Sequence, residues 1–181
     1  MTAPALPYLE GYGPAVAAKV HRLIEADRLG AYLAERYPEG HAIRTDAALM
    51  AEAQALKARH LRTAPPLHRA CYDPRLQVVR DALGLHARIS RNHGGKLKAS
   101  REIRIDAVFR ETPAPFLRMI LAHELAHFRE AEHTKAFYQL CEHLAPGYAQ
   151  LEFDLRLWLT HRDLASGLSQ ARGTEPGVEG S

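Results

Sequence analysis

The run His123-Glu124-Leu125-Ala126-His127 constrains the fold of this chain more than any other part of it. On an α-helix, residues four positions apart lie on one face, with Cβ atoms about 5–6 Å apart. Two imidazoles at that spacing can bind one metal ion at about 2.0–2.1 Å each. Glu124 can aim its carboxylate at the open coordination position and act as a general base. The run therefore predicts a helix with a catalytic metal site, and the mostly apolar residues 116–121 before it predict that this helix is buried.

A third candidate ligand, His133, follows six residues after His127. On a straight helix it would lie about 240° around the axis from His127 and face away from the metal. We therefore expect the chain to turn after about Glu130. Three imidazoles and a water molecule complete the tetrahedral arrangement of a catalytic zinc ion. The sequence thus predicts Zn²⁺ held by His123, His127 and His133, with Glu124 as the catalytic residue.

Two other ligand arrangements were considered for the third position. The spacing from His127 to His133 equals that of the metzincins, but these carry Gly where this chain has Glu130, and they have a Met-turn. No Met follows the motif here, so the metzincin arrangement is excluded. In a gluzincin arrangement, a downstream glutamate, Glu142 or Glu152, would be the third ligand. We prefer His133, which is nearer and has sufficient spacing.

Composition points to an ordinary globular protein. The chain has 181 residues, of which 46% are hydrophobic and 25% charged, and no apolar run approaches the ~20 residues of a membrane span. The first residues lack the basic and apolar regions of a signal peptide. Together with only two cysteines, these features predict a cytoplasmic protein without membrane association. We expect one domain over residues 1–164 and a disordered tail, rich in Gly, Ser and Glu, over residues 165–181.

Basic residues are concentrated between Arg88 and Arg104, where six Lys or Arg side chains accompany one acid, Glu102. Such a run is typical of a solvated hairpin, but it can also form an anion-binding surface for phosphate or nucleic acid. On the second interpretation, this region contacts a polyanion. The candidate substrate-binding residues are Arg91, His93, Lys96 and Arg104.

Periodicity along the chain predicts an α+β fold. The first third reads as helical, and Asp46 is a plausible N-cap for a helix through about Arg62. Short strands are expected at residues 67–72, 76–79, 86–90 and 102–109, with a hairpin turn at residues 92–95. Prolines then open the metal-binding helix, and two further helices follow, from about His133 and from about Tyr148 to His161. We therefore expect N-terminal helices, a small and mostly antiparallel sheet, the metal-binding helix and two C-terminal helices.

Five segments together resemble the YgjP-like metallopeptidase family: residues 82–86, 94–98, 116–127, 133–138 and 151–159. The resemblance runs from about Tyr8 to His161. It implies a zincin-like fold, zinc held by His123, His127 and His133, and Glu124 as catalytic base. It also implies kinship with SprT-like proteases, some of which degrade proteins crosslinked to DNA. Many relatives of that wider group carry Trp-Gly-Ser-Cys where this chain has residues 91–96.

The leading functional prediction is a zinc metallopeptidase, in which the strand at residues 102–109 binds an extended peptide by strand addition. Five side chains are candidates to stabilise the transition state: His93, Arg104, Tyr138, His143 and Tyr148.

Two alternatives keep the metal. Members close to YgjP have been linked with nucleoside triphosphate hydrolysis, and the basic run could hold a triphosphate, so a UTP pyrophosphatase is the first alternative. The second is a nucleic-acid-binding protein with structural zinc. It is disfavoured because neither Cys71 nor Cys141 has the spacing of a zinc ligand pair.

Overall fold

The computed structural model describes residues 4–76 and 101–172. The described residues belong to two compact units, one formed by residues 4–36 with 154–172, the other by residues 37–76 with 101–153. His123, His127 and His133 lie in the second unit. The domain extent, predicted as residues 1–164, stays a prediction.

The second unit contains a parallel pair of strands. β1 (Arg69–Asp73) pairs with β2 (Glu102–Asp106), with Cys71 opposite Arg104. The predicted antiparallel arrangement is wrong for this pair. A parallel connection requires a crossover of a dozen or more residues, and the long segment between Asp73 and Glu102 supplies that length. The predicted strand at residues 86–90, the hairpin turn at residues 92–95, and all but the first residue of the predicted strand at 76–79 lie outside the described residues.

β2 has one buried face. Ile103 and Ile105 are fully buried, whereas Arg104 between them is exposed. The strand was predicted to continue to Phe109 but ends at Asp106. The Asp106 side chain accepts a hydrogen bond from the backbone N–H of Val108 at 2.9 Å and so caps a short 3₁₀ helix, Ala107–Arg110. A local cap thus ends the strand early.

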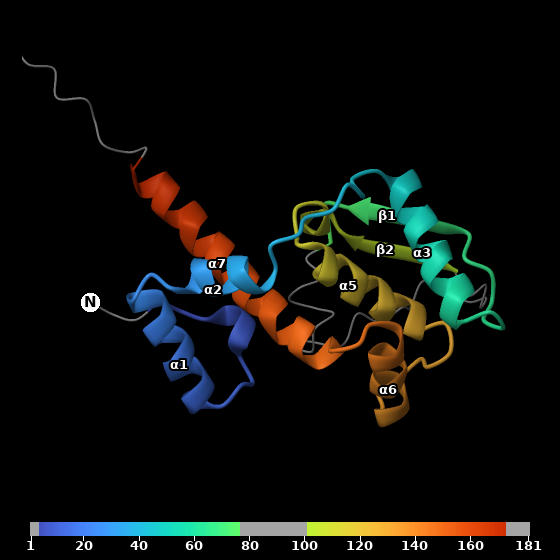
Figure 1. Ribbon diagram of the computed structural model, residues 1–181, viewed down its shortest axis with the longest axis horizontal. Helices are drawn as coiled ribbons and strands as arrows, with labels where there is room; N and C mark the ends of the chain where they lie inside the picture. Colours follow the sequence, from blue (N-terminus) through green and yellow to red (C-terminus); the bar gives the residue numbers. More distant parts are fainter. Residues whose placement is uncertain (1–3, 77–100, 173–181) are drawn as a thin grey trace, which may run out of the picture. The chain divides into compact units, whose positions relative to one another are not determined.

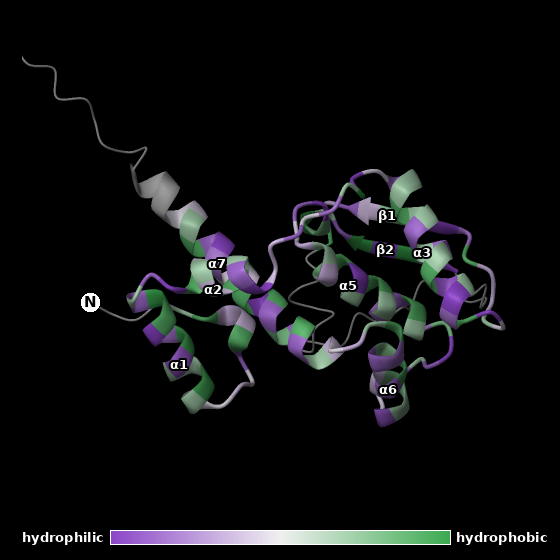
Figure 2. Ribbon diagram, viewed as in Figure 1, coloured by the Kyte–Doolittle hydropathy of each residue, from purple (hydrophilic) through white to green (hydrophobic). Residues whose placement is uncertain are grey.

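This unit also contains three helices, α3 (Asp46–His60), α5 (Ala114–Ala126) and α6 (Lys135–Leu144). α3 contacts β1, and α5 contacts β2, α3 and α6 (Figure 1). Hydrophobic residues recur along β2 and α5 (Figure 2), and most of α5 is buried. α5 is therefore the central helix of this unit, as its apolar sequence predicted.

The N-cap of α3 differs by one residue from the prediction. Thr45, not Asp46, caps the helix, because its hydroxyl accepts the N–H of Ala48 at 3.2 Å. Asp46 instead accepts the backbone N–H of Tyr72 at 3.0 Å. The carboxylate of Asp46 thus connects α3 to β1, a role that depends on tertiary contact.

The first unit consists of α1 (Pro14–Glu25), α2 (Leu29–Arg36) and the part of α7 (Tyr148–Arg172) from Asp154 onward. The fully buried Asp154 carboxylate pairs with Arg36 at 3.1 Å. Gly30 allows α2 to approach α7 closely, since a Cβ at this position would lie 2.8 Å from the ring of His161. A small residue is therefore required there.

α7 is longer than predicted. The sequence predicted that the last helix ends near His161, but α7 continues to Arg172 and so enters the segment predicted to be disordered. Residues 173–181 lie outside the described residues. In the part of the chain that the structure describes, no helix has the length and apolarity needed to cross a membrane.

The contact between α3 and α6 predicts a loss of stability in acid. Nδ1 of His60 lies 3.4 Å from Nε2 of His143, and the two rings meet edge to face. Burial lowers the pKa of His60, and the charges of His143, Arg59 and Arg118 lower it further. His60 therefore binds a proton more readily in the unfolded chain than in the folded protein. Its contribution to the free energy of unfolding is present above about pH 6.5 and is lost as the pH falls through the pKa of His60 in the folded protein.

We expect the free energy of unfolding, measured with urea, to fall less between pH 7.5 and pH 5.5 in His60→Leu than in the wild type. The exposed His68 provides a control, since His68→Leu should keep the wild-type pH dependence. Equal acid sensitivity of the wild type and His60→Leu would contradict the assignment.

Candidate metal centre

The end of α5 begins the turn that the metal site requires. α5 ends at Ala126, and His127 is its C-cap. The backbone N–H groups of Arg129 and Glu130 both donate to the carbonyl of Ala126, at 3.0 and 2.9 Å. The chain then leaves the helical path and starts again at α6, whose N-cap is Thr134. The predicted turn is present, and it begins already at His127.

This turn places His133 against the two histidines of α5. Nε2 of His133 lies 3.1 Å from Nε2 of His127. The ring centroids of His123, His127 and His133 are 5.0, 5.0 and 4.9 Å apart, an almost equilateral triangle. One nitrogen from each ring lies within 4.8 Å of the others, so the three side chains could hold one metal ion.

Hydrogen bonds to the outer nitrogens orient two of these rings. Nδ1 of His123 bonds the Tyr148 hydroxyl at 2.7 Å, and Nδ1 of His127 bonds the Glu130 carbonyl at 3.1 Å. A metal-binding histidine typically donates its other N–H in this way, which leaves Nε2 free to coordinate. The donor set therefore fits a metal ion bound through Nε2 atoms, with zinc and other first-row ions as suitable occupants.

Phe137 forms an apolar surface beneath the histidines. Its fully buried ring lies 5.0, 4.6 and 4.7 Å from the rings of His123, His127 and His133. Tyr138, 45% exposed, lies beside His133 with its ring 6.1 Å away. The site thus has a dry floor and a solvent-accessible side, which a catalytic centre needs.

Glu124, the predicted catalytic residue, is half-buried on α5 directly after His123. Burial raises the pKa of Tyr148 well above its usual range. The negative charge of Glu152 raises this pKa further, and other groups, including Glu124, add to the effect. Both carboxylates therefore lie in the electrostatic surroundings of Tyr148, the residue that bonds His123.

Glu142, one of the two glutamates considered as an alternative third ligand beside Glu152, has another role in the structure. The two carboxylate oxygens of Glu142 accept the backbone N–H groups of Gly147 and Tyr148, at 2.7 and 2.9 Å. Glu142 is thus engaged at the start of α7, while His133 completes the triangle. The geometry favours His133 over Glu142 as third ligand.

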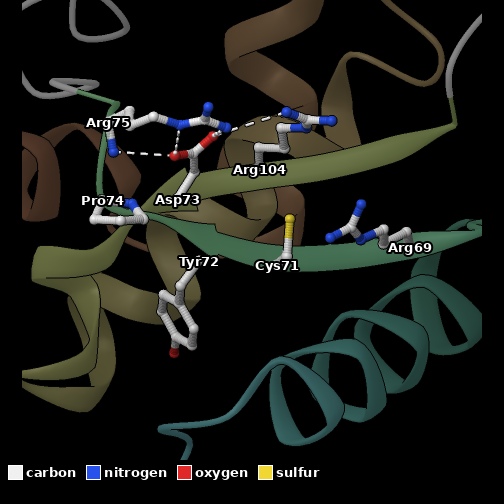
Figure 3. A pocket seen from close by; sticks show the side chains of 7 residues that line it. All are labelled: Arg69, Cys71, Tyr72, Asp73, Pro74, Arg75 and Arg104. Atoms are coloured by element: carbon white, nitrogen blue, oxygen red, sulfur yellow. Dashed lines mark hydrogen bonds and ion pairs between the residues drawn. The ribbon is translucent and has the colours of Figure 1, made fainter.

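Of the four predicted substrate-binding residues, the structure describes Arg104. Arg91, His93 and Lys96 lie outside the described residues. Arg104 lies on the exposed side of β2, where its guanidinium pairs with Glu102 at 3.2 Å and with Asp73 at 3.8 Å. It lines a hollow of about 270 Å³ whose lining includes none of the three histidines (Figure 3).

Three other candidates for stabilising the transition state have different surroundings in the structure. His143 contacts His60, and Tyr148 is buried against His123. Tyr138 remains as the exposed aromatic side chain beside His133. The contacts of Phe137 and Tyr148 with the histidines were missed because nothing in their local sequence distinguishes them from ordinary core residues.

The geometry predicts about one tightly bound divalent ion per chain. We expect elemental analysis of protein purified without chelator to find zinc in the wild type and a large loss in His133→Ala, because two ligands remain instead of three. His68→Ala changes an exposed histidine of the same unit and should keep the metal. Equal zinc content in wild type and His133→Ala would remove His133 from the ligand set.

Comparison with known proteins agrees with this geometry. A model of the family described as "YgjP-like, metallopeptidase domain" matches residues 40–157. A protein of Escherichia coli (strain K12) named "UTP pyrophosphatase" is 55% identical over 159 residues, which cover 88% of this chain and 95% of the relative. No solved structure matches significantly. The chain therefore belongs to the YgjP-like metallopeptidase domain family.

Proposed function

We propose that this chain is a zinc-dependent hydrolase that cleaves UTP to UMP and pyrophosphate. The observation that carries the proposal is the high identity, over nearly the full length of both chains, with the relative named UTP pyrophosphatase. The three-histidine cluster supports it by offering a metal site of the kind that activates water. This proposal reverses the order of the predictions from sequence, in which a peptidase came first and UTP hydrolysis second.

The residues of the cluster have distinct roles in this proposal. His123, His127 and His133 would hold the ion through their Nε2 atoms, and three imidazoles suit zinc. When bound, zinc supplies a Lewis acid that polarises the phosphoryl oxygen and acidifies the attacking water. Glu124 would take a proton from the attacking water as the water oxygen bonds to the α-phosphorus. The bond from the α-phosphorus to the bridging oxygen breaks, and pyrophosphate leaves with the electron pair.

Substrate contacts outside the histidine cluster remain proposals. Arg91, His93 and Lys96 are the proposed partners of the triphosphate, because guanidinium and ammonium groups bind phosphate oxygens through charge-assisted hydrogen bonds. Arg104 is a weaker candidate in view of its pairing with Glu102 and Asp73. The cytoplasmic location also stays a prediction.

A zinc metallopeptidase is the second candidate, and it is favoured by the match to a metallopeptidase domain family. The same three histidines and Glu124 would serve peptide hydrolysis, with a carbonyl carbon in place of the α-phosphorus. The two candidates share the metal chemistry and differ in the substrate-binding groups.

The role of Glu124 can be tested with Glu124→Gln. An amide cannot accept the proton of water, so we expect pyrophosphate release from UTP to fall by about 10²–10⁴-fold. The zinc content should stay at the wild-type level, because Glu124 is not among the three clustered ligands. Glu132→Gln, an exposed change in the turn before His133, should keep full activity. A fully active Glu124→Gln would overturn the mechanism.

The choice of substrate needs its own measurement. We expect the zinc-loaded wild type to release pyrophosphate from UTP and to leave a panel of unfolded proteins and peptides intact. Peptide cleavage that is abolished by Glu124→Gln, with no release of pyrophosphate, would replace the nucleotide proposal by the peptidase.

A further inference from the structure

The junction of α6 and α7 is held by a single carboxylate. One oxygen of Glu142 accepts the N–H of Gly147 at 2.7 Å, and the other accepts the N–H of Tyr148 at 2.9 Å. These donors lie at the start of α7, where backbone N–H groups lack helical partners and the helix dipole favours negative charge. Gly147 has a φ of +81°, a conformation that glycine adopts without strain. Together these features fix where the backbone of Tyr148 lies.

From this position, the Tyr148 side chain reaches the first metal ligand. Its hydroxyl lies 2.7 Å from Nδ1 of His123, and the two rings are nearly parallel, 18° apart. Both side chains are buried, with exposures of 2% and 3%. Water therefore has little access to compete for this hydrogen bond, which gives it a well-defined geometry.

The direction of the hydrogen bond follows from metal coordination. If Nε2 of His123 binds the ion, the neutral ring carries its proton on Nδ1 and donates it to the Tyr148 oxygen.

We propose that Tyr148 is a positioning residue for His123, and that Glu142 holds Tyr148 in place for this role. Tyr148 fixes the ring orientation and the tautomer of His123 in which Nε2 faces the ion, so the α6–α7 junction sets the metal affinity. This inference rests on the metal site of the proposed function. An ordinary core tyrosine, in contrast, would affect the stability of the protein without a selective effect on metal binding.

Tyr148→Phe tests the inference, because it removes only the hydroxyl. The measurement is the Kd for Zn²⁺, from competition with a chromophoric chelator, together with the melting temperature of the metal-free protein. We expect the Kd to rise by about 10–100-fold, as for other residues that orient a metal ligand. At saturating zinc, the kcat for pyrophosphate release should recover much of its wild-type value.

Tyr72→Phe is the matched control. Tyr72 is also buried in the same unit, and its hydroxyl donates to the carbonyl of Ile43 at 2.6 Å. Its loss should lower the melting temperature and leave the Kd for Zn²⁺ unchanged. An equal rise of Kd in both variants would show a general effect of stability and would overturn the role of Tyr148.

Glu142→Gln provides a second test at an exposed position, in case Tyr148→Phe folds poorly. An amide keeps one acceptor oxygen where the carboxylate has two, so we expect a smaller rise of Kd than in Tyr148→Phe. A Kd within twofold of wild type in both Tyr148→Phe and Glu142→Gln would overturn the inference and leave the proposed function intact. A wild type that binds no zinc would overturn both.

Discussion

The reversal of the chain between α5 and α6 is the feature on which the site depends. The carbonyl of Ala126 accepts two N–H groups of the turn, which ends the helix. The carbonyl of Glu130, in the same turn, bonds Nδ1 of His127. One short segment therefore both returns His133 to the centre and orients His127. This coupling explains how three histidines within eleven consecutive residues converge, although a straight helix would separate the third from the others.

The core of the second unit holds this turn in place. α5 is buried against β2 and α6, and Phe137 from α6 lies against all three imidazoles. A well-packed apolar floor limits the movement of the rings, because protein interiors have few voids into which a side chain can move. It also lowers the local polarity, which strengthens the hydrogen bonds of His123. β2, whose Ile103 and Ile105 are buried, packs against α5.

Ion pairs on the strands engage Arg104, the described member of the predicted substrate-binding set. The sequence indicated that the basic run from Arg88 to Arg104 could bind a polyanion. Among the described residues, Arg104 belongs to a network with Glu102 and Asp73. The pKa of Asp73 is lowered mainly by hydrogen bonds from Arg75 and further by the charges of the nearby arginines. The positive charge of Arg104 is thus largely compensated by carboxylates of the two strands. The hypothesis that this region binds a polyanion therefore rests on Arg91, His93 and Lys96.

The sequence by itself indicated the three clustered histidines and the helix that carries the first two. The i, i+4 spacing of His123 and His127, the need for a turn before His133 and the buried character of α5 depend on residues close in the chain, and periodicity and ligand chemistry reveal them. Only the tertiary structure decided the parallel direction of β1 and β2, the role of Glu142 as a cap, and the contact of Tyr148 with His123. These features join residues that are distant along the chain or separated by a turn, and their geometry depends on how helices and strands pack, which no local pattern encodes.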